Sequence, residues 1–335
     1  MAYIMGPYDD ALRLILKQGV RKQNRTGVDS LSVFGIQTRY DISEYFPILT
    51  GRKVWPKAIF AELLWILSGS TNNNDLETLG SKIWSPWVDP EFEKKHGYES
   101  GSFGPTYGFQ LRHFGASYKE VCDQKNRIKK LEKEYKVAYE KDMETEPWNT
   151  PSWDHTCIPD YIALHDRLHW AKEHLIKIGG FDQLKHMVNT LKNDPNSRRN
   201  LFSLWNPAEM GKMRLPACAW SLQVSVDGDK LSGLLTQRSG DYPVGIPANI
   251  LSYSALIYML AQQCNLRPDE LVHNVADAHI YENQIEAVEE YLARPKRDSP
   301  KFILKNAPSI FEYTMDCFEV IDYNPLESIK IPVAV

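Results

Sequence analysis

The segment from Asn249 to Asn265 constrains the fold most, because apolar residues lie nearly all round the helix that it predicts. A helix that is hydrophobic on every side is buried among other elements. Runs typical of β-strands lie on both sides of it in the sequence, at 201–205, 221–226, 230–237, 301–306 and 318–323. No regular alternation of strands and helices connects them. The sequence therefore predicts an α+β fold in which strands gathered in a sheet pack against a buried helix.

The N-terminal part adds a helix over 8–19, a strand over 31–40 and an almost wholly apolar helix over 57–68. Glu62 is the one acid inside that last helix. Burying a lone carboxylate is unfavourable unless hydrogen bonds compensate it, so we predict that Glu62 faces a polar site. The alternative is a surface position on one stripe of the helix.

Residues 115–178 differ in character and read as an insertion into a more compact body. The stretch is dense in Lys and Glu and predicts an exposed amphipathic helix, a loop with Pro and Trp, and a second helix from Tyr161. Potential metal ligands lie on or upstream of the second helix: His165, His169, His174, His155 and Cys157. Without an accompanying acid or a CxxC pair this spacing is a weak signal, so we expect no metal.

The composition argues against several classes of function. The formal net charge of −4 gives no support to general nucleic-acid or membrane-surface binding, so an anionic ligand needs a local arginine cluster. No apolar run approaches the roughly 20 residues of a membrane span. Asp9 and Asp10 precede the first apolar stretch, which is not typical of a signal peptide. The five cysteines form no CxxC pair, which favours reduced thiols and a cytoplasmic location.

Two arginines and one cysteine are the first candidates for chemistry. Arg198 and Arg199 are adjacent in a turn-forming context, and such a pair suits a phosphate, although two surface arginines pointing apart explain the pattern equally well. Cys218 follows a rigid Pro216 and precedes a β-like run, and Arg214 could help to stabilise its thiolate. A buried structural cysteine is the alternative.

A further cluster packs polar side chains into a turn-rich segment that leads into the buried helix: Gln237, Arg238, Ser239, Asp241 and Asn249. So many polar groups beside a core element need partners, and a bound polar ligand supplies them. His279 and Tyr281 then alternate on one face of a strand or extended segment. Taken singly each residue is ambiguous, but their order along the chain is not.

The order of the motifs resembles that of the thymidylate synthases, nearly from end to end. The resemblance is carried by NRTGVDSLSVFG, FAELLWILSGSTN, IWSPW, GPTYG, DPNSRR, the region of Cys218, QRSGDYPVGIPANI, DAHIYENQ and IKIPVAV. Only about residues 115–178 fall outside it, where the family carries insertions of variable length. The resemblance implies one catalytic domain over 1–335 with a thymidylate synthase-like fold, in which a large mixed β-sheet with flanking helices lies at a dimer interface.

The resemblance also implies an activity, the transfer of a one-carbon unit from the co-substrate 5,10-methylenetetrahydrofolate to C5 of deoxyuridylate (dUMP). Cys218 would add to C6, which makes C5 a carbon nucleophile. Glu62 would organise water and proton transfers, and Tyr107 would assist removal of the C5 proton. The residues given a catalytic role in this way are Cys218, Glu62, Tyr107, Asn249 and Asp241.

Two binding sites follow from the same resemblance. The 5′-phosphate would be held by arginines of both subunits of an obligate homodimer, Arg25 and Arg238 of one with Arg198 and Arg199 of the other. Asn249 would read O4 and N3 of the base. The other nucleotide contacts would be Gln237, Ser239, His279 and Tyr281. The folate contacts would be Ile83, Trp84, Trp87, Asp241, Gly245 and Ala334, with the C-terminal tail to Val335 closing over the site.

Four positions depart from the family pattern. Ala219 follows the cysteine where thymidylate synthases have a histidine, and Ala248 stands where they have a phenylalanine. Trp55 and Ser85 also differ from the residues usual in the folate half of the site. Both alanines remove bulk beside the base, which could create space for an ordered water at the exocyclic methylene intermediate.

We therefore hypothesise a dUMP hydroxymethylase, of the sort used by phages that replace thymine with 5-hydroxymethyluracil. In such an enzyme water, and not hydride from the folate, quenches the intermediate. The first alternative is a thymidylate synthase, which the intact IKIPVAV tail favours because tail closure helps to exclude water. A deoxycytidylate (dCMP) hydroxymethylase is the second alternative, although Asn249 suits uracil better than cytosine. The retained catalytic residues argue against a non-enzymatic RNA-binding regulator.

Overall fold

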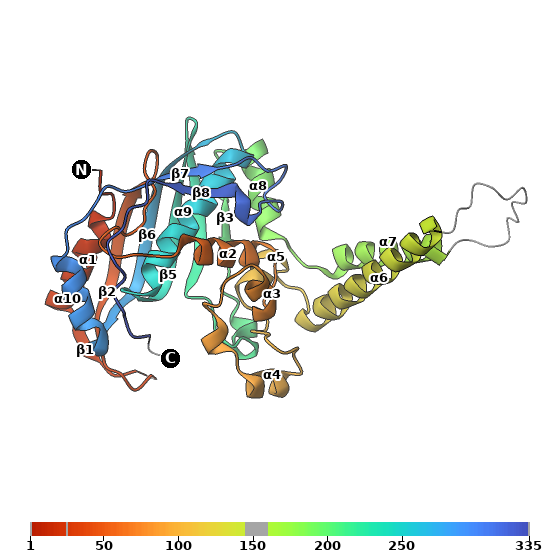
Figure 1. Ribbon diagram of the computed structural model, residues 1–335, viewed down its shortest axis with the longest axis horizontal. Coiled ribbons are helices and arrows are strands. Elements are labelled where there is room, and N and C mark those ends of the chain that lie inside the picture. The colour runs from red at the N-terminus through yellow and green to blue at the C-terminus, as the bar shows by residue number, and fades with distance from the viewer. Residues whose placement is uncertain (1, 25, 145–159, 334–335) are drawn as a thin grey trace, which may run out of the picture. The chain divides into compact units, whose positions relative to one another are not determined.

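The computed structural model describes residues 2–24, 26–144 and 160–333 (Figure 1). The chain forms two compact units, of which one combines Met1–Leu111 with Gln183–Val335 and the other is Arg112–Asp182. No helix in the described ranges is long and apolar enough to cross a membrane. That residues 115–178 are a variable insertion within a single catalytic domain stays a prediction.

Six strands of the described residues form one mixed sheet in the first unit, in the order β1-β2-β6-β5-β4-β3. Their bounds are β1 Val20–Lys22, β2 Ser30–Asp41, β3 Leu201–Ser203, β4 Ala219–Asp227, β5 Lys230–Asp241 and β6 Arg267–Tyr281. Neighbouring strands are antiparallel except β5 and β6, which run parallel. The predicted mixed sheet is confirmed. Strand β5 continues beyond the predicted 230–237 because its polar end pairs with β6, as Ser239 does with Asp277.

The helices of the first unit agree with the three that the sequence predicts. The α-helices are α1 Gly6–Gln18, α2 Pro56–Leu67, α3 Asn73–Thr78, α4 Pro90–His96, α5 Tyr107–Arg112, α8 Gln183–Asn193, α9 Gly245–Gln263 and α10 Ile285–Ala293. Short 3₁₀ helices are η1 Ser85–Trp87, η3 Pro207–Lys212, η4 Glu282–Gln284 and η5 Met315–Cys317. The last two predicted strands, β7 Lys301–Leu304 and β8 Phe318–Ile321, pair with each other in a separate antiparallel sheet.

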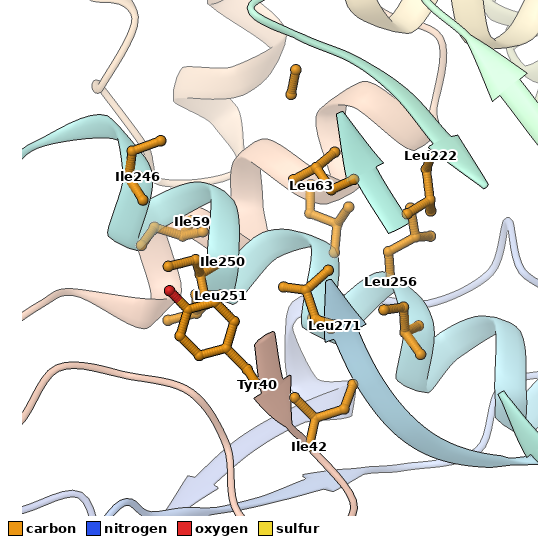
Figure 2. Close-up of a cluster of buried hydrophobic side chains, with 14 of the residues drawn as sticks. Tyr40, Ile42, Ile59, Leu63, Leu222, Ile246, Ile250, Leu251, Leu256 and Leu271 are labelled. Atoms are coloured by element: carbon orange, nitrogen blue, oxygen red, sulfur yellow. The ribbon is translucent and has the colours of Figure 1, made fainter. Parts of the chain in front are cut away.

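Helix α9 is the central element of the core, since it packs against β5 and β6 and also against α2. Figure 2 shows Ile250 and Leu256 of this helix among apolar side chains from α2 and the strands. The prediction of a buried helix is confirmed. It begins at Gly245 and not at the predicted Asn249, because Pro247 is tolerated in a first helical turn, where its missing N–H has no intrahelical partner to lose.

The second unit is built from α6 (Tyr118–Glu144) and α7 (Asp160–Ile178), which pack against each other. Their shared apolar core consists of Ile128, Leu131, Leu168 and Ala171. The ends of the unit come together where Phe114 and Phe181 exchange two backbone hydrogen bonds. No group of three or more His, Cys, Asp or Glu side chains in the described ranges is placed to hold a metal ion. His155 and Cys157 lie outside those ranges.

Candidate active site

Cys218 lies immediately before β4, as the sequence predicts, and Tyr107 at the start of α5 contacts it. The backbone N–H of Cys218 donates to the Tyr107 hydroxyl oxygen at 2.7 Å. Because this oxygen accepts from the backbone, the hydroxyl hydrogen is available to a substrate or a water. Burial, and after it the neighbouring Cys218 thiol, raises the pKa of Tyr107 well above its ordinary range. Tyr107 is therefore a neutral phenol that can donate or relay a proton.

Arg238 of β5 is the cation beside the candidate nucleophile. Its Nη2 lies 3.5 Å from the Cys218 Sγ, and the same guanidinium donates to the carbonyls of Pro216 and Ala217 at 3.0 and 2.9 Å. A guanidinium at this position can donate a hydrogen bond to the sulfur and stabilise negative charge on it during reaction. The suggestion that Arg214 serves this purpose is wrong, because Arg214 forms an ion pair with Asp89. Sequence proximity selected the wrong arginine, since β-pairing brings the more distant one to the sulfur.

Glu62 lies on α2 with its carboxylate against aromatic side chains. Trp84 donates its indole N–H to a Glu62 carboxylate oxygen. Burial raises the pKa of Glu62 to about 7, and the Trp84 hydrogen bond opposes that rise. The ring of Trp84 meets that of Tyr107 edge-on at 5.6 Å, which links Glu62 to the Cys218 region. A carboxyl with a pKa near neutrality is suited to proton transfer, as expected for a residue that faces a polar site.

A buried network fixes the orientation of Asn249 in the first turn of α9. Gln237 Nε2 donates to the Ser239 carbonyl at 2.9 Å, so Gln237 Oε1 must point the other way. That oxygen accepts from Asn249 Nδ2 at 3.0 Å and from His273 Nε2 at 2.9 Å. Burial lowers the pKa of His273 to about 3, so its ring is neutral and carries its hydrogen on Nε2. Asn249 then keeps one N–H and its Oδ1 for a ligand.

A second amide network surrounds Asp241 at the end of β5. Gln284 Nε2 donates to Asp241 Oδ2 at 3.0 Å and to the carbonyl of Pro332 at 2.8 Å. The N–H of Val244 donates to the other carboxylate oxygen of Asp241 at 3.2 Å. Burial raises the pKa of Asp241, and the Gln284 hydrogen bond opposes this rise. Gln284 therefore connects Asp241 to the C-terminal segment, which the structure describes as far as residue 333.

Sequence reasoning missed His273 and Gln284, which support these two networks. Each is fully buried. His273 stands in a run of apolar β6 residues, where a lone imidazole could have signalled a buried polar partner. Gln284 falls within the matched DAHIYENQ motif but has no distinctive neighbour in the sequence. Both are identified only by the partners that the fold brings to them.

The remaining predicted residues divide into those near the networks and those apart from them. His279 pairs with Asp241 across the parallel strands, and its ring meets Tyr281 edge-on at 5.1 Å. Ser239 lies next to Arg238 on β5. Trp84 meets Trp87 edge-on at 6.3 Å. The structure does not join the following predicted residues to the networks by any hydrogen bond: Ile83, Gly245, Arg198 and Arg199.

Arg198 and Arg199 are exposed, and neither guanidinium has an acid partner within the described residues. Two adjacent cations with no acid partner are expected where an anion binds. Arg25, the remaining predicted phosphate ligand, and Ala334, a predicted folate contact, lie outside the described residues.

Comparison with known proteins decides the family. A sequence profile described as thymidylate synthase matches residues 6–335. The chain belongs to the thymidylate synthase family. It is 36% identical to human thymidylate synthase, over 98% of this chain and 90% of that protein. It is also 36% identical to the thymidylate synthase of Corynebacterium aurimucosum, over 98% of this chain and 97% of that protein.

A third relative is the bifunctional dihydrofolate reductase-thymidylate synthase of Paramecium tetraurelia, which is 36% identical over 98% of this chain. The chain spans 61% of the length of that relative. The predicted fold and the predicted class of enzyme, a folate-dependent transferase of one carbon to C5 of dUMP, are confirmed by the family. The family also confirms the prediction of 5,10-methylenetetrahydrofolate as the co-substrate. None of these three relatives is named a hydroxymethylase.

Proposed function

We propose that the chain uses Cys218 to transfer one carbon from methylenetetrahydrofolate to C5 of dUMP, and that water completes the reaction. The thiolate adds to C6, and C5 attacks the methylene carbon of the folate. Loss of the C5 proton and departure of the folate amine leave an exocyclic methylene at C5. Water adds to that carbon while its proton passes to Glu62, and expulsion of the thiolate restores the ring double bond. The products are 5-hydroxymethyl-dUMP and tetrahydrofolate.

The contacts of Cys218 carry the first half of this proposal. Arg238 can donate a hydrogen bond to the sulfur of Cys218. Tyr107 accepts a hydrogen bond from the backbone N–H of Cys218 and keeps its own proton for transfer. Glu62 has a pKa of about 7, so a large fraction is ionised near neutral pH and can accept a proton from water.

The orientation of Asn249 supports uracil as the base. Uracil offers a hydrogen at N3 and an acceptor at O4. Asn249 has one N–H left after its bond to Gln237, together with Oδ1, and these complement O4 and N3–H respectively. Cytosine reverses both groups, because it carries an amine at C4 and an unprotonated N3. The choice of dUMP over dCMP therefore follows from a hydrogen-bond pattern that Gln237 holds in place.

The phosphate and sugar contacts are proposed on the family arrangement. Arg25 and Arg238 would bind the 5′-phosphate with Ser239, and Arg198 and Arg199 of a second subunit would complete the site. This explains why two exposed arginines stand side by side without acid partners. His279 and Tyr281 would bind the 3′-hydroxyl group. The folate would contact the rings of Trp84 and Trp87, with Asp241 binding its polar end.

The preference for water rests on Ala219 and Ala248. Ala219 is only 2% exposed at the start of β4, directly after the nucleophile, and Ala248 precedes Asn249 in the first turn of α9. We infer that two small side chains, where the family has large ones, give a water access to the methylene carbon at C5. A thymidylate synthase is the second candidate. The names of the relatives favour it, and so does the bond of Gln284 to Pro332, which keeps the C-terminal segment at Asp241.

Product analysis distinguishes the two candidates. The protein is mixed with dUMP and methylenetetrahydrofolate, and release of the C5 proton is followed together with the near-ultraviolet rise of dihydrofolate. We expect proton release without the rise, and Cys218→Ser should give neither. A rise equal to the proton released, with thymidylate as sole product, would establish a thymidylate synthase.

Matched variants test the role of the alanines. Restoring bulk with Ala219→His and Ala248→Phe should move the product of the double variant toward the methyl compound, because water is displaced from the methylene carbon. A double variant that still forms only the hydroxymethyl product would contradict this explanation. Faster turnover of dCMP than of dUMP would refute the interpretation of Asn249.

A further inference from the structure

Within the described residues, Gln284 is the one side chain that hydrogen-bonds both to Asp241 and to the C-terminal segment. It lies in η4, directly after β6, and is fully buried. Its Oε1 accepts from the N–H of Tyr281 at 3.0 Å, while its Nε2 donates to Asp241 Oδ2 and to the Pro332 carbonyl. Both hydrogens of the amide are therefore in use. The Tyr281 N–H can only donate, so an amide turned round would set its NH2 group against that N–H and its oxygen against Asp241 and the Pro332 carbonyl.

The end of the C-terminal segment is held by this contact. Further back along the chain, Leu326 N–H donates to the Thr50 carbonyl at 2.8 Å, and Arg294 donates to the Glu327 carbonyl at 2.6 Å. Over the described residues 328–333, the bond from Gln284 to Pro332 is the one hydrogen bond to the rest of the unit. This stretch forms no helix or strand. Ile329 packs against the apolar core, and beyond it the Gln284 amide holds the end of the segment by a hydrogen bond.

We propose that Gln284 is a positioning residue that couples folate binding at Asp241 to closure of the C-terminal segment. The inference rests on the proposed function, in which Asp241 and the segment contact the folate. The amide holds the carboxylate and the segment at a fixed spacing, so a folate that orders either one orders the other. Without the amide, the Pro332 carbonyl has no donor and Asp241 has one donor fewer. The segment can then move away from Asp241, because water replaces the lost donor to Pro332.

Gln284→Met tests the coupling, because methionine has a similar length and no donor. We expect the KM for methylenetetrahydrofolate to rise about 10- to 100-fold, in line with the loss of a hydrogen bond to a charged group. The Kd of dUMP measured without folate should change less than about twofold, since the bond lost at Tyr281 is made by its backbone N–H and not by the side chain that would bind the sugar. Gln284→His, which retains one donor and one acceptor, should recover part of the affinity. Gln262→Met is the matched control, because Gln262 also donates to a backbone carbonyl, that of Leu304 at 2.9 Å.

Amide hydrogen exchange supplies a readout that does not need turnover. In the presence of dUMP and tetrahydrofolate, residues 328–333 should exchange at least about tenfold faster in Gln284→Met than in the unchanged chain or in Gln262→Met. Equal exchange and an unchanged folate KM would overturn the proposal.

A double-mutant cycle excludes a merely structural role. If Gln284 acts through the segment, Gln284→Met should change the folate KM less than about twofold once residues 331–335 are deleted. Additive effects would refute the coupling, and so would a Gln284→Met variant with a raised Kd for dUMP. The proposed function fails on a different observation, the identity of the nucleotide product. The two failures are therefore distinguishable.

Discussion

Glu62→Gln should stabilise the protein while it removes activity, because burial sets the pKa of this carboxyl. The ordinary pKa of the group is 4.5, and in the folded chain it is about 7. A carboxyl whose pKa is raised by folding favours the folded state when protonated. Its contribution is fully present below the unfolded value of 4.5 and is lost as the pH rises through about 7. Glutamine keeps the shape of the side chain and cannot ionise.

The magnitude follows from the two pKa values. The difference between 4.5 and about 7 corresponds to about 3 kcal/mol at high pH, at about 1.4 kcal/mol per pKa unit. The side chain of Glu62 is partly exposed, so water reduces this figure, which is an upper value. The variant should gain up to about 3 kcal/mol in free energy of unfolding at about pH 8, but less than about 1 kcal/mol at about pH 5. Turnover should fall at least about 100-fold.

Urea unfolding of both proteins at the two pH values measures the effect. Protomer concentrations must be equal, because dimer formation adds to the apparent stability. Glu289→Gln, which removes an exposed carboxyl of α10, is the matched control and should change neither value. Equal stability of Glu62→Gln and the unchanged chain at about pH 8 would refute the argument. So would a gain that is independent of pH, since it could not come from ionisation.

Three further outcomes are expected. Arg238→Met should slow alkylation of Cys218 by iodoacetamide about tenfold at neutral pH, because the positively charged hydrogen-bond donor beside the sulfur is removed; an unchanged rate would show that Arg238 does not act on the sulfur. Asn249→Asp should raise the ratio of kcat/KM for dCMP to that for dUMP about 100-fold, measured by competition; no change in preference would contradict base reading by Asn249. Replacing residues 117–178 with a short Gly-Ser linker should leave kcat/KM within about threefold, because Phe114 and Phe181 already join the ends; loss of activity with a folded protein would give the second unit a role in the reaction.

The sequence predicted the main elements of the fold because their periodic patterns are strong. The buried helix, the strand at 31–40 and the apolar helix at 57–68 were all confirmed. Element ends were less accurate. The polar run after Gln237 reads as a turn, but pairing with β6 keeps it in the sheet to Asp241. Local propensity does not contain this information.

The candidate site was predicted through the order of its motifs more than through single residues. Cys218 alone was ambiguous, and proximity in sequence pointed to Arg214 and not to Arg238. Contacts between segments distant in sequence decide such assignments. The same reason explains why Gln284 was missed, since its function depends on partners from the end of β5 and from Pro332.

The one parallel pairing in the described sheet has a consequence for how this enzyme tolerates mutation. Strands β5 and β6 end together at the site, and the pairing of Asp241 with His279 depends on their alignment. That alignment shifts between Leu231 and Gly233, where a side chain at Gly233 would meet Ile257 at 2.6 Å. If β5 slipped by one position along β6, the side chains of Asp241 and His279 would lie on opposite faces of the sheet. A side chain at Gly233 should therefore impair catalysis although Gly233 lies toward the opposite end of β5 from Asp241.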